Sequence, residues 1–281
     1  MDSIFTIIVI ILLALAVSGL VVGVANDAVN FLNSALGSKA APRYVILTVA
    51  SVGIIIGALT SSGMMEVARS GVFYPSMFTF SEVMMLFLGV MFANVLLLDL
   101  FNTFGLPTST TVSLVFGLLG AAMAVSTVKI AGSDILTIAD MSQFINSGKA
   151  MAIIFAIVIS VVIAFVCGSV IMYLTRIIFS FRYHSAFSKF GALWCGIAFA
   201  AISYFAVFKG LKDTSLISPA LIDFAHHNPW TFVLSLWGGW SIFMFILQHA
   251  FKVQILRITV LAGTFSLALA FAGNDLVNFI G

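Results

Sequence analysis

The sequence predicts an all-α membrane protein: a polytopic helical bundle with a re-entrant helical hairpin and an inverted-repeat architecture whose second repeat is incomplete. Three observations lead to this fold class. The 281 residues are 62% hydrophobic and 8% charged, whereas about 25% of the residues of a soluble domain are charged. The motif Asn-Asp-x-x-Asn occurs at 26–30 and again at 274–278, each time at the end of an apolar run. A Gly-x-Pro sequence at 105–107 interrupts a long apolar region.

Composition also limits the classes of partner. The mean hydropathy of +1.21 indicates an integral, multi-pass protein surrounded by the lipid bilayer. We expect that bilayer to be the cell (inner or plasma) membrane. The net charge is only +2 and no basic run could follow a phosphate backbone, so no nucleic acid is expected to bind. Cys167 and Cys195 lie inside apolar segments, where packing residues are expected rather than a disulfide or a metal site.

The intervals between charged residues predict the membrane-spanning segments. A helix needs about 20 apolar residues to cross the hydrocarbon core. Most of the intervals are long enough to be crossing helices, and the first is predicted to be retained rather than cleaved as a signal peptide. The intervals are 3–26, 44–65, 83–98, 100–128, 150–175, 190–208, 228–251 and 258–274.

The region 82–126 differs from the other segments. Asp99 alone separates its two apolar runs, and the turn Gly105-Leu106-Pro107 follows closely. We expect a sharp reversal between two half-helices, because non-helical backbone at membrane depth is tolerated only inside protein or beside a water-filled cavity. Asp99 is predicted either to bond to Thr103 or to lie near the site. Glu82, at the mouth of the hairpin, is predicted to be a solvated charge.

Basic residues and the number of crossings predict the topology. If the first helix runs outside to inside, seven basic residues lie inside and five outside, a weak preference for this orientation. The inside set is Lys39, Arg43, Arg176, Arg182, Lys189, Lys252 and Arg257. Five ordinary crossings precede the last segment, so the two motifs lie on oppositely directed helices, as in an inverted repeat. Residues 1–210 would form the first repeat, and 211–281 a linking helix and the start of the second.

The two motifs carry candidate cation ligands. Asn26, Asp27 and Asn30 fall within about one helical turn, and a carboxylate near a bilayer is costly unless it has a function. Carboxylate and amide oxygens suit Na⁺, and Gly23 and Gly37 would ease a break in the helix that adds backbone carbonyls. Asn274, Asp275 and Asn278 would form the second half of the site. The alternative is that these residues cap helix ends at the membrane interface.

The hairpin carries a candidate anion site. Ser109, Thr110 and Thr111 follow Pro107 at the predicted start of a helix, where free N–H groups and the helix dipole attract anions. No Lys or Arg occurs between Gly71 and Val128, so an anion there would need hydroxyls, N–H groups and bound cations. This combination favours ion-coupled symport. The alternative is that the hydroxyls only cap the helix.

These motifs resemble those of the inorganic phosphate transporter (PiT) family of cation-coupled symporters. The first motif with its trailing Gly37-Ser38, the second motif, and the segment from Gly105 to Thr111 are similar to the family's signatures. The resemblance implies phosphate held by Ser109, Thr110, Thr111 and the Asn26/Asp27 region. It implies Na⁺, or H⁺ in some members, near the residues of both motifs, and no other cofactor. It also implies homodimers and uptake into the cell.

The sequence departs from the family pattern at a few positions. Val112 stands where a histidine is common, Val24 replaces an alanine, and the second motif reverses the usual Gly-Ala order. The chain ends at Gly281, just after the second motif. The second hairpin is therefore expected to come from a longer chain or from a partner.

The sequence therefore predicts a carrier, not an enzyme: Na⁺-coupled symport of inorganic phosphate by alternating access. Three alternatives stay open. A symporter for another oxyanion such as sulfate is disfavoured because Asp27 would accept a hydrogen bond that only phosphate can donate. An intramembrane hydrolase with Ser109 as nucleophile lacks a base to activate the hydroxyl. A non-transporting membrane subunit or fragment that needs a second chain is the third.

Overall fold

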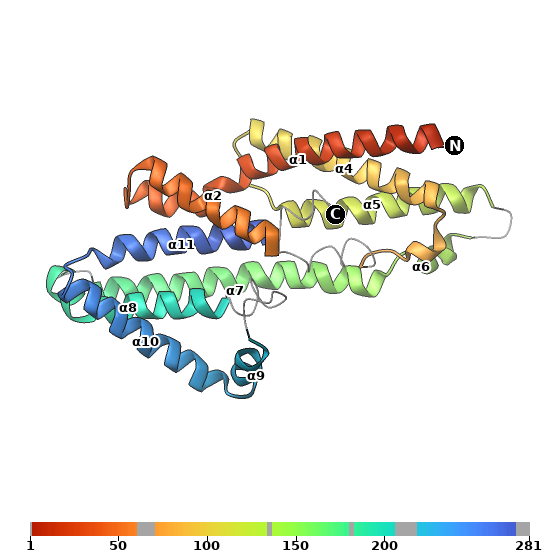
Figure 1. The fold of residues 1–281 in the computed structure, drawn as a ribbon. Coiled ribbons are helices and arrows are strands. Elements are labelled where there is room, and N and C mark those ends of the chain that lie inside the picture. The colour runs from red at the N-terminus through yellow and green to blue at the C-terminus, as the bar shows by residue number, and fades with distance from the viewer. Residues whose placement is uncertain (1, 61–70, 134–136, 180–182, 206–217, 274–281) are drawn as a thin grey trace. The chain divides into compact units, whose positions relative to one another are not determined.

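A computed structural model of the chain describes residues 2–60, 71–133, 137–179, 183–205 and 218–273. These ranges form helices joined by turns (Figure 1), with an isolated antiparallel bridge between Phe73 and Ile145. The prediction of an all-α fold is confirmed. The longer helices are α1 (Asp2–Gly37), α2 (Arg43–Thr60), α4 (Phe80–Thr103), α5 (Thr110–Ala131), α7 (Ser147–Phe179), α8 (Tyr183–Phe205), α10 (Pro229–His249) and α11 (Ile255–Phe271). The short ones are η1 (Pro75–Met77), η2 (Ile138–Asp140), α6 (Met141–Phe144) and α9 (Pro219–His227).

The long helices match the length of a membrane crossing. Within the described ranges, seven helices are long and apolar enough to cross a bilayer, and α11 is a shorter apolar helix of 17 residues. The chain is a multi-pass integral membrane protein. Both α4 and α5 are among the seven, at 24 and 22 residues. The re-entrant form of the hairpin and the inverted repeat stay predictions.

The chain divides into two compact units, and two of the four boundaries between them fall inside long helices. The first unit comprises residues 1–28, 62–162 and 274–281, and the second comprises 29–61 and 163–273. The boundary after residue 28 lies within α1, and the boundary after residue 162 lies within α7. The sequence-based division at residue 210 concerns a repeat relation, which these units do not test.

In the first unit, α4 and α5 form the predicted hairpin. A capping box starts α4, because the N–H of Thr79 donates to Oε2 of Glu82 at 2.7 Å and the N–H of Glu82 donates to the Thr79 hydroxyl. The helix ends at Thr103, and Gly105 takes a left-handed conformation with φ of 65°. Pro107, which lacks an N–H, precedes the start of α5. The predicted Gly-x-Pro turn is confirmed.

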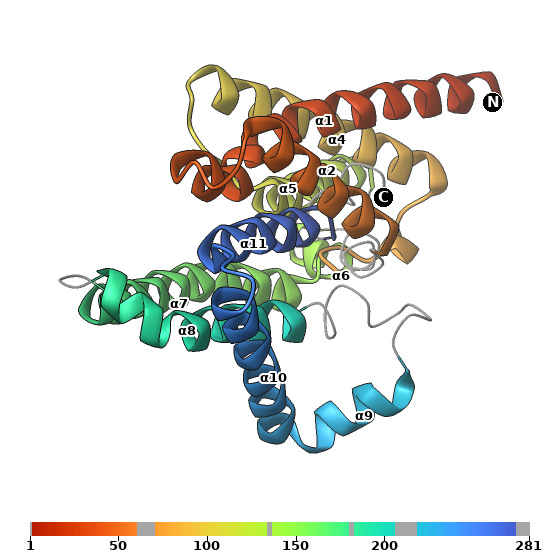
Figure 2. The same ribbon diagram turned by 60° about the vertical axis from the view of Figure 1, so that its left-hand side comes forward.

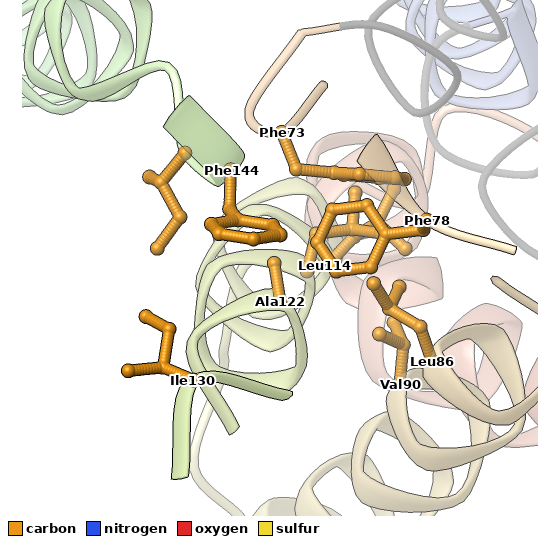
Figure 3. Close-up of a cluster of buried hydrophobic side chains, with 10 residues drawn as sticks. Phe73, Phe78, Leu86, Val90, Leu114, Ala122, Ile130 and Phe144 are labelled. Atoms are coloured by element: carbon orange, nitrogen blue, oxygen red, sulfur yellow. The ribbon is translucent and has the colours of Figure 1, made fainter. Parts of the chain in front are cut away.

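Aromatic side chains pack around the base of this hairpin. Figure 3 shows Phe73, Phe78 and Phe144 lying against residues of α4 and α5. The ammonium of Lys129 lies 5.9 Å from the ring centroids of both Phe78 and Phe144, where cation–π attraction operates. It also donates to Oε2 of Glu82 at 2.9 Å. Glu82 is thus a partly exposed charge, as predicted, and it also forms an ion pair and caps α4.

In the second unit, glycines allow close helix packing. α2 packs against α11, and α8 packs against α10 and α11 (Figure 2). A Cβ at Gly53 would lie 2.6 Å from the carbonyl oxygen of Phe265. A Cβ at Gly57 would overlap the carbonyl oxygen of Leu269 and lie 2.8 Å from Cβ of Ala272. The small-xxx-small spacing therefore brings the α2 backbone directly against α11.

Gly57→Ala is expected to destabilise the protein, because the added methyl group has no space against α11. Overpacking of this kind costs about 1–3 kcal/mol. Gly89→Ala in α4 is the matched control, since a Cβ there meets no atom within 4 Å. The control should be neutral or stabilising, because alanine favours the helix by about 0.5–1 kcal/mol. Thermal unfolding in detergent measures both, and equal melting temperatures for the two variants would contradict the packing argument.

Candidate functional site

Asn26 connects the first motif to the hairpin turn. Its side chain is 7% exposed. Its Nδ2 donates to Oδ1 of Asn102 at 2.8 Å and to the carbonyl oxygen of Leu106 at 3.1 Å. Its Oδ1 accepts from the N–H of Thr108 at 3.0 Å. One buried amide of α1 thus holds both sides of the turn between α4 and α5.

Asn102 completes this connection from the hairpin side. Its Nδ2 donates to the carbonyl oxygen of Val22 at 3.0 Å, while its Oδ1 accepts from Asn26. We call Asn26 and Asn102 the asparagine latch. Its four hydrogen bonds join one turn of α1 to the turn that precedes α5. The first motif and the hairpin turn are separate features of the sequence, and the structure brings them together.

Asp27 lies beside the latch. It is 5% exposed, so a carboxylate is buried at the point where α1 meets the hairpin turn. Asn30, one turn further along α1, is exposed. Helix α1 runs without interruption to Gly37, which corrects the prediction of a break near the motif and the alternative of a helix-end cap. The hairpin turn satisfies the amide of Asn26, so the helix does not need to open there.

The three predicted hydroxyl residues take different positions at the start of α5. Ser109 is the exposed N-cap residue, and its hydroxyl accepts from the N–H of Val112 at 3.3 Å. Thr110 is 1% exposed, and its hydroxyl has no hydrogen-bond partner among the residues that the structure describes. Thr111 is half-buried. Since Thr108 is bonded to Asn26, these residues begin directly after the latch.

Asn94 is a candidate that the sequence reasoning missed. It lies in α4, is 2% exposed, and its Oδ1 accepts from the hydroxyl of Ser113 at 2.5 Å. Its Nδ2 has no partner within the described part of the chain. Ser113 is one helical turn from Thr110, so two buried groups able to donate lie near the start of α5. The signal in the sequence was a lone amide within the apolar run 83–98.

The remaining predicted residues lie apart from this cluster or outside the described ranges. Asp99 is an exposed residue of α4 and takes no part in the asparagine latch. Asn274, Asp275 and Asn278 lie outside the described residues. Among the residues that are described, no group of three or more His, Cys, Asp or Glu side chains could hold a metal ion. Within the described residues, the site contains neutral oxygens and the carboxylate of Asp27.

The sequence and the fold of this chain are similar to those of known phosphate transporters. The model of the phosphate transporter family matches residues 23–281. A protein of Thermococcus kodakarensis that is provisionally named a phosphate permease is 31% identical over 196 residues, which cover 68% of this chain and 45% of that protein. The solved structure of a protein described as "The sodium-dependent phosphate transporter" matches with a TM-score of 0.66 and 17% identity, over 96% of this chain and 65% of that one. The chain thus spans about half of its curated relative and two thirds of the solved chain.

Proposed function

The chain belongs to the phosphate transporter family, and from this premise we propose that it carries inorganic phosphate across the membrane together with Na⁺. The resemblance of the motifs and the fold shared with a sodium-dependent phosphate transporter both support this substrate pair. Transport would proceed by alternating access, and the chain would act as a homodimer. The family is one of transporters, which argues against the intramembrane hydrolase.

The observation that carries the proposal is the asparagine latch. It fixes a buried carboxylate, Asp27, next to the turn that starts α5. The first N–H groups of a helix lack intrahelical partners and carry the positive end of the dipole. The latch would thus keep the proposed cation ligands of α1 next to the proposed anion site, although Asn26 and Thr108 are 82 positions apart in the sequence.

The charges of the two ligands suggest which residues would bind each of them. Ser109, Thr110 and Thr111 would bind phosphate with the Asn26/Asp27 region. Na⁺ would bind oxygens of Asn26, Asp27 and Asn30, with the second motif (Asn274, Asp275 and Asn278) as its counterpart. No Lys or Arg lies between Gly71 and Val128, and Lys129 is paired with Glu82. A bound cation would therefore supply the positive charge that phosphate needs, which couples the two ligands.

Phosphate is favoured over sulfate by the same residues. Near neutral pH phosphate carries a hydroxyl that can donate a hydrogen bond, whereas sulfate only accepts. The carboxylate of Asp27 could accept that bond. Within the described part of the chain, the Nδ2 of Asn94 and the hydroxyl of Thr110 have no partner, so both could donate to phosphate oxygens as the site fills.

Thr110→Val separates a binding role from a structural one. The hydroxyl has no partner within the described ranges, so its replacement by an isosteric methyl group should leave stability unchanged or raise it. If the hydroxyl donates to phosphate, affinity should fall by roughly 10- to 100-fold, the value of a hydrogen bond to a charged group. Equilibrium binding of radiolabelled phosphate in Na⁺ measures the affinity, and thermal unfolding measures the stability.

Ser126→Ala is the matched control for this variant. Ser126 is also a buried hydroxyl of α5 without a partner in the described chain, but it lies more than four helical turns beyond Thr110. It should leave phosphate affinity unchanged. Equal affinities in Thr110→Val and in the unmodified protein would remove Thr110 from the site.

A further inference from the structure

A cavity with both polar and apolar lining lies within the second unit. Its volume is about 470 Å³, within the range of pockets that enclose small ligands. The turn after α1, the start of α8, the end of α10 and the start of α11 line it together. Nothing in the proposed transport site uses these residues.

The lining combines cationic and apolar side chains. Lys39, His184 and Arg257 line the cavity, and no Asp or Glu is among the described lining residues. Phe187, Leu256 and Val260 supply apolar surface on the same cavity. A ligand that fits this lining carries a negative charge at one end and an apolar body at the other.

The backbone conformation at Lys39 allows the charge of this residue to be tested. Lys39 has φ of 52°, in the left-handed region that favours glycine. A lysine at such a position strains the backbone, and glycine would relieve that strain. Lys252, in the turn after α10, has the same φ but does not line the cavity. The two lysines therefore form a natural pair for comparison.

The position of the cavity indicates that its ligand is a membrane lipid. It is bounded by the ends of α8 and α10, which are long and apolar enough to cross a membrane, and by the start of the shorter apolar helix α11. The ends of crossing helices lie at the depth of lipid headgroups. The three loops that supply its basic residues were predicted to lie on the same, inner side of the membrane, where anionic lipids gather. We propose that this cavity binds an anionic phospholipid, with its phosphate near Lys39 and Arg257 and an acyl chain against Phe187 and Val260.

Lys39→Gly tests the proposal with Lys252→Gly as control. Both changes remove one charge and relieve the same backbone strain, so both variants should melt at the same or a higher temperature than the unmodified protein. Only Lys39→Gly should weaken binding of phosphatidylglycerol, by about fivefold for the loss of one cation near a lipid surface. The purified chain is titrated in detergent with phosphatidylglycerol or phosphatidylcholine, and bound lipid is counted by native mass spectrometry. A second variant, Arg257→Gln, should weaken phosphatidylglycerol binding to a similar extent.

The outcomes decide between sources of the phosphate group. Preference for phosphatidylglycerol over phosphatidylcholine, lost in Lys39→Gly and retained in Lys252→Gly, supports the proposal. Equal binding of the two lipids, or equal loss in both glycine variants, overturns it. Displacement of phosphatidylglycerol by millimolar inorganic phosphate at constant ionic strength would assign the cavity to free phosphate and also overturn it.

Discussion

Asp27→Asn is expected to abolish Na⁺-dependent phosphate uptake while leaving the fold intact. The substitution keeps the size of a side chain that is 5% exposed and removes its charge. The asparagine amide carries no negative charge to balance a bound cation. Loss of one partner of a buried charge pair costs about 2–5 kcal/mol. Uptake should therefore fall by at least about 30-fold at Na⁺ levels that saturate the unmodified protein. Uptake into proteoliposomes measures the loss, and thermal unfolding confirms the fold.

Asp99→Asn is the matched control, because Asp99 is an exposed carboxylate of the same unit. It should retain uptake within about twofold, the range expected for an exposed charge. If Asp27→Asn retains Na⁺-dependent uptake, the carboxylate is not a coupling ligand. Loss of uptake in both variants would show that uptake depends on the total negative charge of the first unit and not on a specific site at Asp27.

Asn26→Leu is expected to free the hairpin turn and to reduce phosphate uptake by at least about tenfold. The leucine removes the partner of the Thr108 N–H and of the Leu106 carbonyl, and each buried hydrogen bond contributes about 1 kcal/mol. Amide exchange at 104–108 should accelerate, because the N–H of Thr108 loses its partner. Hydrogen–deuterium exchange measures the turn, and radiolabelled phosphate uptake measures the function.

Asn33→Leu provides the comparison on the same helix, since Asn33 is an exposed amide of α1. It should change neither measurement. If Asn26→Leu loses uptake while amide exchange at 104–108 is unchanged, Asn26 binds a transported ligand but does not hold the hairpin turn. Unchanged uptake with faster exchange would make the latch structural only.

Local chemistry explains which parts of the fold were predictable. The membrane-spanning segments could be predicted from the length of the apolar runs. In lipid, the backbone N–H and C=O groups of such a run must hydrogen-bond to each other, which favours a helix. The turn at 105–107 followed from glycine and proline, whose backbone preferences are independent of context. The end of α1 was not predictable from charge, because Asn26 and Asp27 are accommodated inside the helix. The pairing of Glu82 with Lys129 joins residues 47 positions apart and depends on hairpin packing.

The candidate site was predictable in its residue types but not in its connections. A buried amide and carboxylate beside each other signal function wherever they occur in lipid. Their bonds to the turn depend on the approach of α1 to the hairpin, which no local pattern encodes. Asn94 was missed because a single amide within an apolar run does not distinguish a site from an ordinary membrane-spanning helix. Its burial and an Nδ2 without a partner in the described chain distinguish it.

Uptake of radiolabelled phosphate by proteoliposomes that contain this 281-residue chain tests the central claim most directly. The proteoliposomes are compared under an inward Na⁺ gradient and under a K⁺ gradient of equal size. Na⁺-coupled symport predicts accumulation above the external phosphate concentration with Na⁺ and none with K⁺. Equal uptake under both gradients would contradict it, and so would the absence of both uptake and phosphate binding in the folded protein.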